Sequence, residues 1–154
     1  MDRSTFKRDV FAIFSIVVVV GMLCAVPVLA QDNSTATPAS PPAYVVVNSQ
    51  TGFPLDPFFV SLQGGGAVAA DSIATGCSGF VTAAPSLSVN YKGAAELMRA
   101  FFYSDGDTVL VVQLPDGSFL CNDNTNEQLL DPTVTVDKPV QGIYNVWVGS
   151  RLAK

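Results

Sequence analysis

The residues from Thr108 to Cys121 constrain the fold of this chain most, because their pattern predicts a β-hairpin. The first half alternates between two faces, with Thr108, Leu110, Val112 and Leu114 on one and Val109 and Val111 on the other. β-Branched alternation of this kind is typical of a strand that is buried on at least one side. Pro115-Asp116-Gly117 then favours a tight turn, since proline fixes φ, aspartate bonds nearby backbone and glycine accepts positive φ. Phe119 and Cys121 share one face of the returning strand.

Oxygen-bearing side chains gather at the open end of this predicted hairpin. Two precede the first strand and three follow the second: Asp105, Asp107, Asn122, Asp123 and Asn124. Carboxylate and amide oxygens are the ligands that calcium prefers, so these five side chains are candidate ligands for calcium, and no other cofactor is expected. The sequence favours the alternative, that the same side chains only cap turns, as Asp and Asn often do. An EF-hand is excluded, because the loop lacks its central glycine and terminal glutamate.

Short alternating runs separated by Gly and Pro continue through the rest of the chain. We predict further strands at residues 44–48, 58–62, 67–70, 80–83, 87–91, 97–103, 132–137 and 143–149. Residues 97–103 also have helical propensity, but their alternation and aromatic end favour a strand. About eight to ten short strands predict an all-β domain, a sandwich or a barrel. In the last run Tyr144 and Trp147 point to opposite faces, and we expect Trp147 in the core.

The first thirty residues differ from the rest and predict a secretory signal helix. A short start with net basic charge precedes an apolar stretch from Val10 to Leu29, which ends in the small-residue cleavage pattern Val28-Leu29-Ala30. The alternative is an uncleaved anchor, since about twenty apolar residues also span a bilayer. Residues 31–43, rich in Ser, Thr, Pro and Ala, predict a disordered spacer. We expect a secreted, periplasmic or cell-surface protein that meets a membrane only through an uncleaved signal segment.

Cleavage after Ala30 leaves 124 residues with five basic and eleven acidic side chains, a formal charge of −6. One folded domain, over residues 44–154, is expected for this length. An acidic surface without a basic stripe argues against nucleic acid as a partner. Histidine is absent from the chain, and with it the commonest general base and metal ligand.

Two cysteines remain in the predicted mature chain, Cys77 and Cys121. In an exported protein an even pair predicts a disulfide. On the chain-entropy model, closing a loop of about 45 residues stabilises the fold by roughly 4 kcal/mol. The alternative is two buried thiols, and zinc is disfavoured because two cysteines without histidine do not complete four ligands.

A set of short motifs resembles a known family when it is taken in order. The motifs are Gly76-Cys77-x-Gly79-Phe80, Asn90-Tyr91, Asp107-Thr108-x-Leu110, Pro115-Asp116-Gly117, Cys121-Asn122-Asp123, Asp131-Pro132 and Gly142-x-Tyr144-x-Val146-Trp147-Val148-Gly149. This set resembles the bacterial pre-peptidase C-terminal domain and its stand-alone secreted relatives, over residues 57–150. The resemblance implies a jelly-roll-like antiparallel β-sandwich with a non-catalytic role. It also implies, for some members, bound calcium or adhesion to extracellular matrix.

Three classes of function follow from these observations. The first is a secreted non-catalytic binding or accessory module whose partner is an extracellular protein or polysaccharide. The alternative is a structural cell-envelope protein that assembles with itself, favoured by the spacer and by any exposed sheet edge. A hydrolase using Asp105 and Asp107 is least favoured, because carboxylates two residues apart at a strand end offer no cleft. We therefore expect that the protein is not an enzyme.

Overall fold

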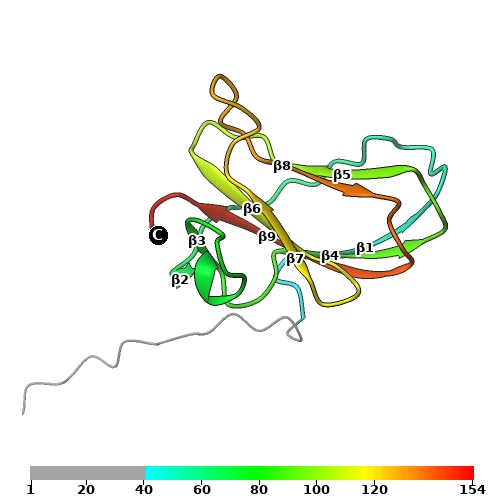
Figure 1. The fold of residues 1–154 in the computed structure, drawn as a ribbon, viewed down its shortest axis with the longest axis horizontal. Coiled ribbons are helices and arrows are strands. Elements are labelled where there is room, and N and C mark those ends of the chain that lie inside the picture. The colour runs from blue at the N-terminus through cyan, green and yellow to red at the C-terminus, as the bar shows by residue number, and fades with distance from the viewer. Residues whose placement is uncertain (1–40) are drawn as a thin grey trace, which may run out of the picture. The chain divides into compact units, whose positions relative to one another are not determined.

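The computed structural model describes residues 41–154, and β-strands dominate this part of the chain (Figure 1). The predicted signal helix at residues 1–30 and the spacer residues 31–40 lie outside the described residues. In chain order the elements are β1 Val45–Gln50, β2 Val68–Ala69, the 3-10 turn η1 Ala70–Ser72, β3 Phe80–Val81, β4 Leu87–Lys92, β5 Leu97–Phe101, β6 Thr108–Gln113, β7 Phe119–Asn122, β8 Thr133–Asp137 and β9 Gly142–Ser150. None of residues 41–154 forms a helix long and apolar enough to span a membrane. The all-β prediction is confirmed.

The strand β9 is the centre of a seven-stranded sheet. Its antiparallel neighbours are β6 on one side and, on the other, β4 along its first half and β3 at its last residue. β7 extends the sheet beyond β6, β2 beyond β3, and β1 beyond β4. β1 runs parallel to β4, so the sheet is mixed and the prediction of a purely antiparallel arrangement is wrong. Residues 51–86 supply the long crossover that a parallel pair needs.

Both faces of this sheet are covered, and β6 and β9 are consequently buried on two sides. A separate antiparallel pair, β5 and β8, lies over one face, where its inward residues join Tyr91, Leu110, Val112, Tyr144, Val146 and Val148 in one cluster. On the other face, Val109, Val111 and Trp147 pack with side chains from the segment between β2 and the loop after η1, and with Val81 of β3. Tyr144 and Trp147 therefore point to opposite faces, and the prediction that Trp147 belongs to the core is confirmed.

The predicted hairpin is confirmed as β6 and β7, which pair in antiparallel register. Its turn closes through two backbone bonds: Leu114 N–H donates to the carbonyl of Ser118 at 2.8 Å, and Gly117 N–H donates to the carbonyl of Leu114 at 2.9 Å. Gly117 has φ of 86°, which favours glycine at that position. Asp116 Oδ1 accepts bonds from the hydroxyl and the amide of Ser118, and these bonds lower the pKa of Asp116.

One predicted strand does not form. Residues 58–62 make no strand, and none of their backbone groups is hydrogen-bonded to another described residue. Their aromatic side chains stay exposed, 48% for Phe58 and 72% for Phe59. Phe59 packs edge-on against Phe101 of β5, with ring centroids 6.0 Å apart. Strand propensity was insufficient here, because no neighbouring strand is positioned to pair with this segment.

The other predicted strands form, with small differences at their ends. Residues 97–101 are a strand, so the helical alternative for this run is wrong. The disulfide between Cys77 and Cys121 is confirmed, with Cα atoms 5.8 Å apart, and the alternative of two free thiols is wrong. The bond ties the loop after η1 to the hairpin strand β7. An intramolecular disulfide is typical of an oxidising compartment, which supports the expectation of export.

Tyr144 gives a testable pH dependence. Its side chain is 1% exposed and its hydroxyl donates to the carbonyl of Val140 at 2.7 Å. Burial raises the pKa of Tyr144 above its usual value near 10. The folded state therefore keeps the proton longer than the unfolded chain, so this stability is fully present below pH 10 and is lost as the pH rises through the folded-state pKa.

We expect Tyr144→Phe to remove this part of the alkaline loss of stability, measured by urea unfolding between pH 8 and 11. At neutral pH the variant should be less stable by about 1 kcal/mol, because it lacks the bond to Val140. Tyr103→Phe is the control, since Tyr103 is 80% exposed and should leave the alkaline profile unchanged. An unaltered profile in Tyr144→Phe would contradict the assignment.

Candidate functional site

The structure brings Asp107 and Asp123 to the same end of the hairpin through Arg151, the residue after β9. Arg151 N–H donates to the carbonyl of Asp107 at 3.1 Å. Its guanidinium forms an ion pair with Asp123 Oδ2 at 2.6 Å, and the Ser78 hydroxyl donates to the same oxygen at 3.0 Å. The Asp123 carboxylate thus joins the hairpin to the end of β9 and to the loop that carries Cys77.

Two of the remaining predicted calcium ligands stabilise the following loop. Asn122 Oδ1 accepts a hydrogen bond from Thr133 N–H at 3.0 Å. With its amide turned so that the nitrogen faces the two backbone carbonyls, Asn124 donates to the carbonyl of Asp123 at 2.9 Å and to that of Leu130 at 3.3 Å. Both side chains therefore serve the turn chemistry that was the alternative to calcium.

Asp105 and Asp107 complete the predicted set. Both residues are exposed, and their carboxylates have no hydrogen bond or ion pair with residues 41–154. Within the same range, no group of three or more His, Cys, Asp and Glu is placed to hold a metal ion. Of the five predicted ligands, Asn122, Asp123 and Asn124 thus have side chains engaged in structural contacts, and Asp105 and Asp107 do not.

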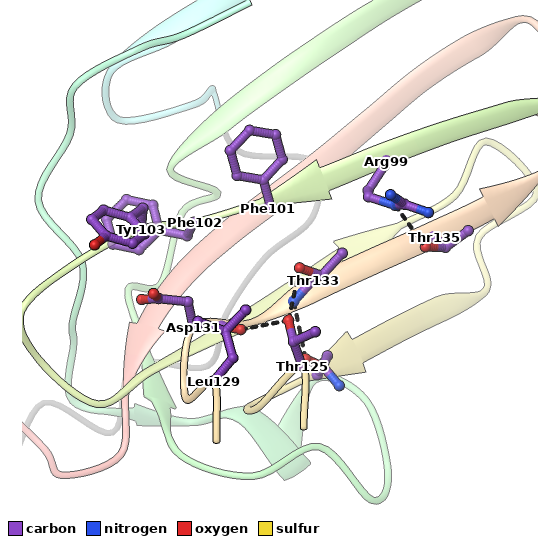
Figure 2. A pocket seen from close by; sticks show the side chains of 10 residues that line it. Arg99, Phe101, Phe102, Tyr103, Thr125, Leu129, Asp131, Thr133 and Thr135 are labelled. Carbon is purple, nitrogen blue, oxygen red and sulfur yellow. Dashed lines mark hydrogen bonds between the residues drawn. The ribbon is translucent and has the colours of Figure 1, made fainter. Parts of the chain in front are cut away.

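A different surface of the molecule is hollowed. A groove of about 660 Å³ opens beside the outer face of the β5–β8 pair, with walls from β5, β8 and the loop between β7 and β8 (Figure 2). Alternation along the two strands creates this face: Met98 and Ala100 of β5 and Val134 and Val136 of β8 turn toward the core. The intervening residues are left to line the groove.

Exposed apolar side chains form one side of the groove. Tyr103 is 80% exposed, Phe101 45% and Leu129 43%. Leu129 is held in place by its loop, because its N–H donates to Asn126 Oδ1 at 2.9 Å and its carbonyl accepts from Thr125 N–H at 3.0 Å. Aromatic side chains grouped on a concave surface are typical of a binding site.

Polar side chains form the rest of the groove. The Thr125 hydroxyl lies 2.7 Å from the carbonyl oxygen of Asp131 and 2.9 Å from the Thr133 hydroxyl. Asp131 Oδ1 accepts a bond from Ser104 N–H at 3.1 Å. Arg99 Nε lies 3.4 Å from the Thr135 hydroxyl. Hydroxyls, a carboxylate and a guanidinium thus lie within reach of one ligand.

Sequence reasoning did not find this groove. The alternation of residues 97–103 predicted two faces of a strand but not which face would be exposed. The signal that was available is Arg99, because a charged residue between apolar neighbours in a strand marks the outward face. The loop wall was not predictable, since it depends on where β7 and β8 lie relative to β5.

Comparisons of the chain with protein-family models, with curated proteins and with solved structures find no match. The resemblance to the pre-peptidase C-terminal domain therefore stays a prediction from the quoted motifs.

The calcium prediction can be tested by thermal unfolding. We expect equal melting temperatures in calcium and in excess chelator, because Asp123 is engaged by Arg151 and Ser78 while Asn122 and Asn124 stabilise the loop. A calcium-dependent rise that disappears in Asp123→Asn would contradict this expectation. Asp116→Asn, at the other end of the hairpin, is the matched control.

Proposed function

We propose that residues 44–154 are a secreted, non-catalytic binding module with a jelly-roll-like β-sandwich, and that its ligand occupies the groove beside β5 and β8. The observation that supports this proposal is the grouping of Phe101, Tyr103 and Leu129 in a concave, solvent-open surface. Large apolar side chains exposed together mark contact surfaces more often than they mark neutral surface. The disulfide supports export of the module.

A polysaccharide fits the groove better than a protein partner does. Aromatic rings stack on the apolar faces of sugar rings, while hydroxyls and charged groups bond sugar hydroxyls. The groove offers both kinds of group, since Thr125, Thr133 and Thr135 line it together with Phe101 and Tyr103 (Figure 2). Protein interfaces are usually flatter and larger than such a groove.

The groove also supports a binding role over hydrolysis. Glycoside hydrolases use two carboxylates roughly 5 to 10 Å apart across the bond that they cleave. Asp131 is the one carboxylate among the residues that line the groove, and it is bonded to the backbone of Ser104. A ligand bound here would therefore be held and released unchanged.

A self-assembling envelope protein is the second candidate. The observation in its favour is the exposed run at residues 58–62, whose backbone forms no hydrogen bond with any other residue from 41 to 154. Unpaired backbone beside exposed aromatic residues is a template for pairing with another chain. We nevertheless expect the mature protein to elute as a monomer in size-exclusion chromatography at high concentration, because its net negative charge opposes association. A stable oligomer that dissociates in Phe59→Ser would favour the second candidate.

Binding should depend on the aromatic residues of the groove. We expect Tyr103→Ala to weaken retention on immobilised polysaccharides about five- to tenfold, because one stacked ring contributes about 1 to 1.4 kcal/mol. Affinity electrophoresis in gels that contain neutral and acidic polysaccharides measures this. Tyr44→Ala is the matched control, since Tyr44 is a half-exposed tyrosine in the segment leading into β1. Equal retention of the two variants would contradict the assignment of the groove.

A further inference from the structure

We propose that the ligand of the groove is a polysaccharide whose sugar units carry carboxylate groups, and that Arg99 binds one of these carboxylates. This inference rests on the proposed binding function and names the ligand class for the same groove. The structure provides three supporting features: a guanidinium without a carboxylate partner, aromatic rings beside it, and a polarity along the groove.

Arg99 is exposed on the outer face of β5. Its Nε contacts the Thr135 hydroxyl at 3.4 Å, and this is the one hydrogen bond of its guanidinium to residues 41–154. The ion pair found in this range belongs to Arg151 instead. Both terminal nitrogens of Arg99 are therefore left to donate to a ligand, and a carboxylate matches two parallel N–H groups better than any neutral group does.

The aromatic rings lie where a sugar attached to that carboxylate would extend. Figure 2 shows Arg99 and Thr135 at one end of the groove and Asp131 and Tyr103 at the other, with Phe101 between them. Phe59 packs edge-on against Phe101, with an angle of 82° between the ring planes. The groove thus has the Arg99 guanidinium at one end and aromatic rings along its length.

Asp131 gives the groove its polarity. Its carboxylate, at the end opposite Arg99, accepts from sugar hydroxyls but repels a carboxylate. Glu127 adds a second acidic group to the loop between β7 and β8, whereas Asp137 lies on the outward face of β8 two residues beyond Thr135, at the Arg99 end. The charge of the whole chain is −5, so a polyanion gains no general attraction. Preference for an acidic sugar therefore depends on Arg99 alone, and binding should show a weak dependence on salt.

The test uses polymers that differ only in their carboxylates. Polygalacturonate and its methyl-esterified form share one backbone, and alginate and its propylene glycol ester provide a second pair. We expect the mature protein to bind at least one acidic polymer about tenfold more tightly than its ester, since a charge-assisted bond is lost on esterification. Isothermal titration calorimetry and affinity electrophoresis measure the ratio.

Substitutions assign the preference to one side chain. Arg99→Gln should abolish the difference between acid and ester, and Arg99→Lys should retain part of it, because lysine keeps the charge without the planar pair of donors. Lys154→Gln removes an equal charge at the C-terminus and should leave the ratio unchanged. Arg99 is exposed, so these substitutions should change the melting temperature little. A marked fall in melting temperature would therefore identify a misfolded variant.

The outcomes separate this inference from the function on which it rests. Equal binding of acid and ester that is lost in Tyr103→Ala overturns the carboxylate inference and leaves the binding groove intact. An acid preference that persists in Arg99→Gln also overturns it. Failure of the protein to bind any acidic, esterified or neutral polymer overturns both proposals.

Discussion

Tyr144, Val146 and Val148 pack into one hydrophobic cluster and Trp147 into the other, so β9 buries side chains on both of its faces. It is also paired along both edges, with β6 on one side and with β4 and β3 on the other. Every layer of the described domain therefore contacts this strand. Gly149 is required for this pairing, because a Cβ at that position would clash with the carbonyl oxygen of Phe80 where β3 pairs with β9.

At Trp147 in β9, the free energy gained by burying the ring exceeds the cost of an unmade hydrogen bond. Its Nε1 is buried and has no hydrogen-bond partner among residues 41–154, an arrangement that costs roughly 1 to 3 kcal/mol. Removing an indole ring from water stabilises the fold by about 4 to 6 kcal/mol, from its area and the usual coefficient. Burial of the ring outweighs the lost bond, so a tryptophan is favoured even without a partner for its N–H.

Because β6 and β9 are covered on both faces, their side chains are not available to a ligand. β2 and β3 extend the sheet at one edge, and the loop between η1 and β3 is tied to the hairpin by the disulfide and by Ser78. The β5–β8 pair has only two strands, and one of its faces is left open to solvent. The candidate groove lies beside that open face, with the loop before β8 as its second wall.

The sequence predicted the local features of the fold better than the distant pairings. The hairpin was predictable because alternation and Pro115-Asp116-Gly117 act over a few residues. The disulfide was predictable from an even number of cysteines in an exported chain. The run at 58–62 has the composition of a strand yet forms none, because pairing requires a neighbour that composition does not specify. The parallel pairing of β1 and β4 was missed for the same reason.

Arg151 and Arg99 show why the acidic and amide side chains at the open end of the hairpin indicated a binding site less well than an unpaired arginine does. The register of β9 with β6 places Ser150 opposite Thr108, so the next residue, Arg151, meets Asp107 and Asp123. The local sequence does not reveal this pairing, which engages the Asp123 carboxylate and the backbone carbonyl of Asp107 in structural contacts. An exposed ion pair of this kind contributes at most about 1 kcal/mol, but it occupies the carboxylate. Arg99 lies among aromatic and hydroxyl side chains without such a partner, and an unpaired cation in a groove is the group that a ligand can still engage.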